Sequence, residues 1–125
     1  PTPMAIEMMP AVAAGMNRMP KYVFSRTLHE VTWSNSTLVK GDIAAAMREL
    51  KDRSGPDLVI LGSGSIVAQL APAGLIDEYQ VVVNPIVLGR GRTMFDGVAE
   101  KLPLQLTTTR AFRNGNVLLR YQPPA

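Results

Sequence analysis

The sequence predicts an α/β fold: a mixed, mostly parallel sheet flanked by helices, closed by an antiparallel hairpin at the C-terminal end. Apolar segments of strand length alternate with segments of helical period along the chain. The apolar run from Leu58 to Leu61 passes through two glycines into an amphipathic segment, which is the strand, turn and helix order of an α/β unit. Near the end, two alternating segments flank Asn114-Gly115, a pair that strongly favours a hairpin turn.

Composition indicates one globular domain spanning residues 1–125. Of the 125 residues, 46% are apolar and 18% are charged, and no linker or repeat divides them. The net charge of +3 is scattered and has no aromatic residues interleaved with it, so we expect no nucleic-acid partner. The chain has no cysteine and a single histidine, His29, which we expect at the surface and which argues against a metal site. No apolar run reaches the ~20 residues of a membrane span, and the start lacks a signal-peptide pattern. We therefore expect a cytoplasmic protein with no membrane partner.

The first half of the chain contains three segments with clear signals. Methionines and prolines alternate before residue 20, β-branched and aromatic residues mark two short strands, and apolar residues recur at helical spacing after Gly41. We expect short helical pieces ending near Asn17, strands at residues 21–25 and 36–39, and a helix from Ile43 to about Asp52 capped by Asp42.

The second half begins with a predicted strand at residues 58–61, buried on both faces. The helix after Ser65 should bury Ile66 and Leu70 and end near Ala71, because Pro72 follows. Further along we expect a buried strand around residues 79–83 and a loop interrupted by glycines at residues 88–92. After this loop Met94 and Phe95 should pack in the core again. The hairpin strands should lie at residues 104–109 and 117–121.

The turn Gly62-Ser63-Gly64-Ser65 is a candidate phosphate-binding site. Glycines let backbone N–H groups approach an anion, and the start of a helix supplies unpaired N–H groups and partial positive charge. The turn lacks the third glycine of a dinucleotide fingerprint and the lysine of a Walker loop. The alternative is an ordinary strand-to-helix corner in which the glycines relieve strain and Ser65 caps the helix. The motif alone leaves both interpretations open.

A second candidate is Ser25-Arg26-Thr27, which closes the predicted strand before it. Small hydroxyls and a guanidinium fork at a strand end can hold a phosphate, although a polar strand end with a solvated arginine explains these three residues more simply. Arg90 and Arg92 allow the same two interpretations, and we expect them to be solvated.

Five blocks in register give a more specific signal. They are KYVFSRTL from Lys21, LVILGSGS from Leu58, GLIDEY from Gly74, PIVLGRGRTMF from Pro85, and the final hairpin. Together they resemble the dihydrofolate reductase-like family, in the branch that includes the reductase domain of the bifunctional riboflavin-biosynthesis deaminase-reductase. The resemblance covers nearly the whole chain and implies that family's three-layer fold.

The resemblance also implies NADPH as cofactor. It places Ser25, Arg26 and Thr27 near the adenosine 2′-phosphate, and the segment Gly62, Ser63, Gly64, Ser65 and Ile66 around the pyrophosphate. This agrees with the anion-binding interpretation of both turns and strengthens it for the Gly62 turn.

The chain departs from the family pattern in two ways. Dihydrofolate reductases begin the turn with two adjacent glycines, often joined by a cis bond, whereas here Ser63 follows Gly62. The family also has a preceding stretch with two strands, a helix, a substrate-facing loop and the catalytic carboxylate. Its first strand normally lies between the strands matched here by residues 58–61 and 79–83. We therefore expect an incomplete N-terminal part of the fold, and no catalytic residue is assigned.

These expectations define the leading hypothesis: an NADPH-dependent reductase acting on a small pterin-, aminopyrimidinone- or carbonyl-like substrate. The protein would be a homodimer, as is common in the family. The alternatives are a non-catalytic nucleotide-binding or dimerisation module that keeps the fold, and a structural fragment without a ligand.

Overall fold

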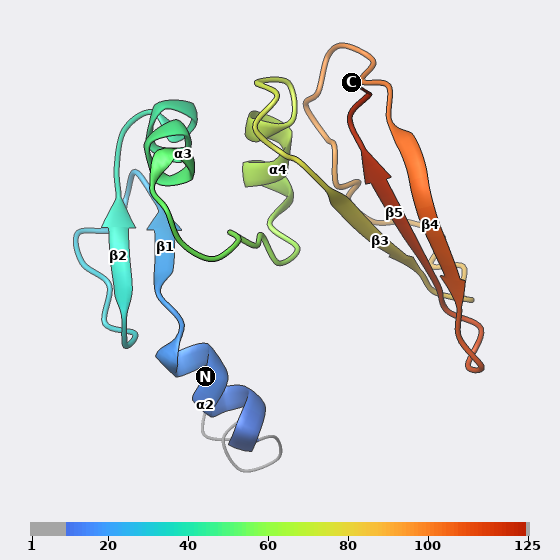
Figure 1. Ribbon diagram of the computed structural model, residues 1–125, viewed down its shortest axis with the longest axis horizontal. Helices are drawn as coiled ribbons and strands as arrows, with labels where there is room; N and C mark the ends of the chain where they lie inside the picture. The colour runs from blue at the N-terminus through green and yellow to red at the C-terminus, as the bar shows by residue number, and fades with distance from the viewer. Residues whose placement is uncertain (1–9, 125) are drawn as a thin grey trace. The chain divides into compact units, whose positions relative to one another are not determined.

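The computed structural model describes residues 10–124 and confirms the α/β class (Figure 1). The chain divides into two compact units, residues 1–46 and 47–125. Helical pieces expected before Pro10 lie outside the described residues. The described elements are α2 (Pro10–Arg18), β1 (Lys21–Phe24), β2 (Ser36–Val39), α3 (Ile43–Asp52), α4 (Gly64–Leu70), β3 (Tyr79–Val83), β4 (Gln105–Ala111) and β5 (Val117–Gln122).

In the first unit, β1 and β2 form a parallel pair in the register Lys21 to Ser36 and Phe24 to Val39. Helix α2 precedes them and begins at Pro10, a residue type suited to the first helical position. Both strands and the end of the helix agree with the sequence prediction to within one residue.

The side chain of Lys21 caps the C-terminal end of α2. Its ammonium donates hydrogen bonds to the carbonyls of Met16, Asn17 and Met19, at 2.6, 3.2 and 2.9 Å. The same ammonium lies 4.5 Å from the centre of the Trp33 ring, whose indole N–H donates to Asn17 Oδ1 at 2.6 Å. A cation here satisfies carbonyls that the helix leaves unpaired and offsets the negative end of its dipole.

Helix α3 forms as predicted. Asp42 Oδ1 accepts a hydrogen bond from the Ala44 N–H at 3.1 Å, which confirms the predicted cap. The side chain of Met47 is buried. On the exposed face, Arg53 and Glu49 form an i,i+4 ion pair at 3.0 Å.

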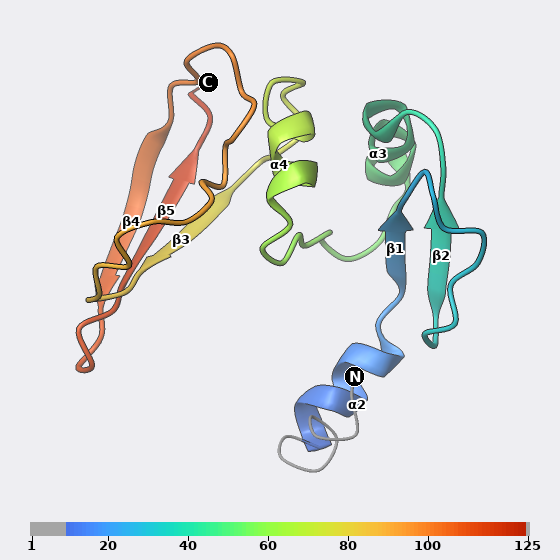
Figure 2. The same ribbon diagram turned by 180° about the vertical axis from the view of Figure 1, so that it is seen from behind.

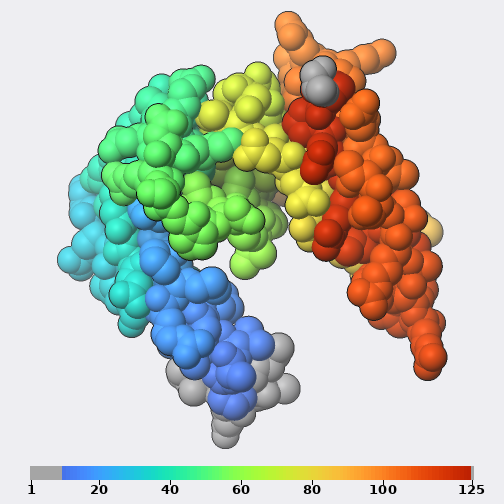
Figure 3. Space-filling model, viewed as in Figure 1, coloured from blue at the N-terminus to red at the C-terminus, as the bar shows by residue number. Residues whose placement is uncertain are grey.

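In the second unit, β5 lies between β3 and β4 and is antiparallel to both, as the two views show (Figures 1 and 2). The hairpin turn at Asn114-Gly115 forms as predicted, with Gly115 at φ +93°. A register shift between Leu106 and Thr108 interrupts β4, and the Thr107 hydroxyl there donates to the Arg120 carbonyl at 3.1 Å. The side chains of β4 and β5 lie together along this sheet (Figure 3, orange and red).

The core of the second unit forms where α4 meets one end of this sheet. Val67, Ala71 and Tyr79 are buried together. Four half-buried side chains pack against them: Ile60, Ile76, Leu104 and Tyr121. Burial of apolar surface at this contact joins α4 to β3 and so holds the Gly62 turn at the start of the helix.

The predicted strand at residues 58–61 is wrong for this structure. These residues form no ladder with any described residue, and the side chains of Val59 and Leu61 are 74% and 77% exposed. A strand requires a hydrogen-bonded neighbour, and an apolar run indicates only the tendency to form one. Of this run, Ile60 reaches the core.

The prediction of a buried strand at residues 79–83 is correct in position but wrong in burial. Tyr79 is buried, whereas Val82 and Val83 are about half exposed. Among the described strands β3 pairs only with β5, and the described residues cover the side chains at its Val82–Val83 end only in part.

Candidate functional site

The Gly62 turn has the backbone conformation that its sequence predicts. Gly62 adopts φ +67°, in the left-handed region that side chains other than glycine rarely enter. The Gly62–Ser63 bond is trans. Helix α4 begins at Gly64 with Ser63, rather than the predicted Ser65, in the capping position. Ser63 has φ −82° and ψ 87°, and its side chain makes no capping hydrogen bond.

The first turn of α4 presents free backbone donors. The first helical bond runs from the Val67 N–H to the Ser63 carbonyl at 3.0 Å. Within residues 10–124, the N–H groups of Gly64, Ser65 and Ile66 have no acceptor. Ser65 is exposed, and Ser63, Gly64 and Ile66 are half-buried. Three adjacent donors at a partly open turn can bind an anionic oxygen.

A loop from further along the chain packs on this turn. A β-carbon at Gly64 would lie 3.5 Å from the Met94 carbonyl oxygen and 3.9 Å from its α-carbon. Met94 is therefore a neighbour of the candidate site, and no local sequence signal indicated it. The predicted return of Met94 and Phe95 to the core is partial, since both remain more than a third exposed.

Arg90 and Arg92 precede Met94 in this loop. Both are exposed, and neither forms an ion pair with any residue from 10 to 124. This matches the expectation of solvated arginines.

The Ser25 turn is organised by its own hydroxyl. Ser25 Oγ accepts hydrogen bonds from the N–H groups of Thr27 and Leu28, at 3.3 and 3.1 Å, and lies 3.4 Å from Thr27 Oγ1. Arg26 and Thr27 are exposed, and Ser25 is half-buried. This geometry leaves the guanidinium of Arg26 free for a ligand or for water, so both interpretations of the turn remain open.

The two turns belong to different units of the chain. Residues 25–27 lie in the first unit and residues 62–66 in the second. That both contact one dinucleotide therefore stays a prediction.

A hollow of about 260 Å³ lies beside β3 in the second unit. Its walls are Tyr79, Phe95, Val98, Glu100, Leu102 and Leu104. The rings of Tyr79 and Phe95 pack with centroids 5.9 Å apart and planes tilted by 55°. Burial raises the pKa of the Tyr79 hydroxyl, so this group stays protonated at neutral pH.

Other classes of site find no support in residues 10–124. No group of three or more histidine, cysteine, aspartate or glutamate side chains gathers there in a way that could hold a metal ion. His29 is exposed, as expected. No helix within this range is long and apolar enough to span a bilayer.

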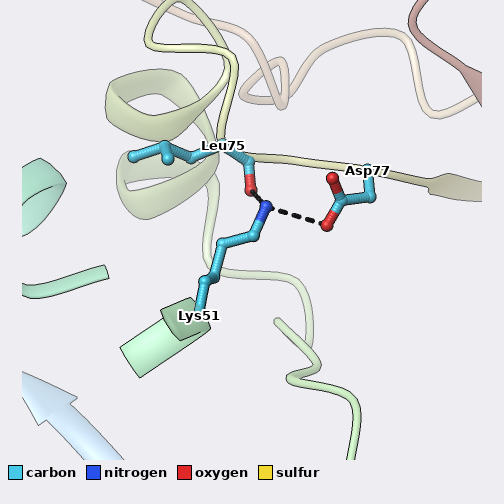
Figure 4. Close-up of polar contacts among 3 residues, drawn as sticks. All are labelled: Lys51, Leu75 and Asp77. Carbon is cyan, nitrogen blue, oxygen red and sulfur yellow. Dashed lines mark hydrogen bonds and ion pairs between the residues drawn. The ribbon is translucent and has the colours of Figure 1, made fainter. Parts of the chain in front are cut away.

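Lys51 was also not indicated by the sequence. Its ammonium donates hydrogen bonds to the Leu75 carbonyl at 3.0 Å and to Asp77 Oδ2 at 2.8 Å (Figure 4). The sequence separations are 24 and 26 residues, too long for any helical pairing rule to reveal.

Comparison with known proteins identifies relatives over most of the chain. The RibD C-terminal domain family matches residues 2–118. The uncharacterized protein YyaP of Bacillus subtilis is 33% identical over 101 residues, covering 81% of this chain and 53% of that protein. The uncharacterized protein YwjB of the same organism is 28% identical over 91 residues, covering 73% and 52%. The chain thus spans about half the length of these curated relatives.

Two solved structures share the fold. A putative riboflavin biosynthesis protein from Shewanella sp. PV-4 superposes with a TM-score of 0.76 at 21% identity, covering 91% of this chain and 68% of that one. A pyrimidine reductase-like protein from Corynebacterium diphtheriae superposes with a TM-score of 0.63 at 16% identity, covering 83% and 50%. The family match over residues 2–118 confirms the resemblance derived from the sequence, and the shared fold agrees with it: this chain belongs to the RibD C-terminal domain family.

Proposed function

We propose that this chain is the cofactor-binding part of an NADPH-dependent reductase that acts on a small pterin-, aminopyrimidinone- or carbonyl-like substrate. Membership of the RibD C-terminal domain family supports a reductase-like protein of the riboflavin-pathway type. The observation that carries the cofactor proposal is the Gly62 turn, where a left-handed glycine precedes three backbone N–H groups without acceptors among residues 10–124.

In this proposal the Gly62 turn holds the pyrophosphate. Backbone donors suit a diphosphate because they are fixed in place before the ligand arrives and carry no side-chain entropy cost. Gly64 lets the ligand approach closely because it has no β-carbon. Ser63 and Ser65 add hydroxyl donors, and the Ser63 hydroxyl is not used as a helix cap.

Ser25, Arg26 and Thr27 serve the 2′-phosphate of the adenosine. The exposed Arg26 guanidinium has no ion-pair partner among the described residues and offers a planar fork to phosphate oxygens. The Ser25 hydroxyl fixes the turn by accepting two backbone N–H groups, which orders the segment before it meets the anion.

When bound, NADPH supplies the hydride. The residues of this chain bind and orient the cofactor, and no catalytic acid is proposed among them. A cytoplasmic homodimer is also part of this proposal. The exposed apolar side chains of Ile86, Val87 and Leu88, of which Val87 is 95% exposed, favour association.

Isothermal titration of the purified protein with NADPH tests the proposal, followed by NADPH oxidation assays with a pterin, an aldehyde and an aminopyrimidinone. Binding together with oxidation by one of these substrates is the expected result. Binding without oxidation by any of them would instead favour a non-catalytic nucleotide-binding module. A folded protein that binds no dinucleotide rejects the cofactor proposal.

A further inference from the structure

Lys51 connects two distant points of the second unit. It lies in the last turn of α3, and its ammonium binds the Leu75 carbonyl and the Asp77 carboxylate just before β3 (Figure 4). The Lys51 side chain is 28% exposed, whereas that of Asp77 is 82% exposed. The carbonyl bond is thus the more sheltered of the two, and the ion pair adds to it.

The segment between these two points carries the candidate cofactor turn. Upstream of the turn, residues 58–61 make no ladder bonds with any described residue. On this side Ile60 packs on the core, and on the downstream side the turn is held through α4 and the contacts that hold α4 in place.

Three hydrogen bonds and the backbone of α4 link Lys51 to the turn. The ammonium holds the Leu75 carbonyl, and the Leu75 N–H donates to the Leu70 carbonyl at 3.2 Å. Leu70 is the last residue of α4 and is only 1% exposed. At the other end of this helix the Val67 N–H donates to the Ser63 carbonyl at 3.0 Å. Lys51 is thus connected to the turn through Leu75 and the seven residues of α4.

We propose that Lys51 is a positioning residue that holds the Gly62 to Ile66 turn in its binding geometry by fixing the exit of α4. This inference rests on the proposed function as far as the cofactor is concerned. The positioning of the turn is a separate claim that can be measured without any cofactor.

The chain offers a matched control at the end of the same helix, where Arg53 directly follows α3. Arg53 and Glu49 also form an ion pair, at 3.0 Å, but their side chains are 60% and 72% exposed and the pair spans one helical turn. Removing Arg53 deletes a cation next to the end of α3 whose ion pair involves only Glu49 of that helix. The comparison therefore separates loss of charge from loss of the connection to Leu75 and Asp77.

The experiment measures hydrogen exchange of the peptide covering residues 58–70, without cofactor, and the dissociation constant for NADPH. It compares the wild type with Lys51→Ala, Lys51→Arg, Asp77→Asn and Arg53→Ala. In Lys51→Ala we expect exchange of this peptide to rise about two- to fivefold and NADPH binding to weaken about two- to fivefold, as suits a pair near the surface. Lys51→Arg should keep the exchange of this peptide and the NADPH affinity close to the wild-type values, because its guanidinium reaches the same acceptors. Asp77→Asn should give a smaller change, and Arg53→Ala none.

Equal hydrogen exchange of the peptide 58–70 in Lys51→Ala and Arg53→Ala overturns the proposal, since Lys51 would then be an ordinary surface cation. If Lys51→Ala does not fold, Lys51→Met takes its place, because methionine keeps a side chain of similar length and removes both bonds of the ammonium. A wild-type protein that binds no NADPH contradicts the proposed function and the cofactor part of this inference. Faster exchange in Lys51→Ala would still support the positioning of the turn in that case.

Discussion

Gly64 lies directly against Met94: a β-carbon at Gly64 would stand 3.5 Å from the Met94 carbonyl oxygen. That distance is an ordinary van der Waals contact, and Gly64 does not have a positive φ. Gly64→Ala should therefore leave the free energy of unfolding unchanged or raise it by up to about 1 kcal/mol, the usual gain of alanine over glycine in a helix. Under the proposed function its effect on the ligand should be larger, because a methyl group beside the free N–H groups hinders the close approach of a pyrophosphate.

We expect Gly64→Ala to weaken NADPH binding about ten- to a hundredfold, equivalent to the loss of one charge-assisted hydrogen bond. Gly62→Ala is the contrasting variant. Gly62 has φ +67°, so alanine there should cost about 1–2 kcal/mol of stability by itself. Urea denaturation and calorimetric titration measure both quantities. Unchanged NADPH affinity in a stable Gly64→Ala protein would indicate an ordinary strand-to-helix corner.

A second prediction concerns how substitutions at residues 58–61 change the free energy of unfolding. Val59→Thr should change the free energy of unfolding by less than about 0.5 kcal/mol, as is usual for exposed positions. Ile60→Ala should cost about 1 to 2 kcal/mol, because Ile60 packs on Val67, Ala71 and Tyr79 although it is only half-buried. Urea denaturation distinguishes the two. A cost for Val59→Thr as large as that for Ile60→Ala would show that this run is buried in solution.

This run also shows what the sequence could and could not predict. Local signals located β1, β2, α3 and the final hairpin, because turn residues, caps and apolar spacing act over a few residues. Burial of residues 58–61 and of β3 depends on neighbours distant in sequence, and no local pattern reports whether they are present. The same holds for the contacts of Met94 with Gly64 and of Lys51 with Asp77.

The candidate site was predictable to a similar extent. Gly62 and Gly64 were identified from the strand, turn and helix order, and the left-handed φ of Gly62 agrees with that interpretation. The capping residue was misplaced by two positions, since the helix begins at Gly64 and leaves Ser63 before it. Helix boundaries are set by backbone geometry at single residues, which residue preferences determine only loosely.

The burial of Tyr79 predicts a loss of stability at alkaline pH. Burial raises its pKa in the folded state above the ordinary value of about 10 found in unfolded chains. The folded protein therefore holds this proton more tightly, so the contribution of Tyr79 is complete below about pH 10 and is lost as the pH rises through the folded-state pKa. The urea midpoint of the wild type should be lower above pH 10 than at pH 8. In Tyr79→Phe the difference between the two pH values should be smaller. Tyr121→Phe, on the neighbouring strand, serves as the control. An identical decline in all three proteins would exclude Tyr79 as the cause.

The hydrogen bond between Trp33 and Asn17 at the C-terminal end of α2 predicts a change in tryptophan fluorescence when it is removed. Trp33 is the only tryptophan, and its indole N–H donates to Asn17 Oδ1 at 2.6 Å. Asn17→Ala should cost about 0.5–1.5 kcal/mol for the lost hydrogen bond and shift the fluorescence emission of Trp33 to longer wavelength as water replaces the amide. Asn114→Ala, which alters the hairpin turn in the other unit, should leave the emission unchanged. Emission that does not move in Asn17→Ala would contradict this contact.

The central claim is that NADPH is bound with its 2′-phosphate at Arg26, and the most direct measurement is the ratio of the NADH to the NADPH dissociation constant. A charge-assisted hydrogen bond is worth about 1.5–3 kcal/mol, so Arg26→Ala should weaken NADPH binding about ten- to a hundredfold and leave NADH binding unchanged. Arg48→Ala, another exposed arginine, is the control and should alter neither. A ratio near one in the wild type, or an equal loss for both dinucleotides in Arg26→Ala, would contradict the claim.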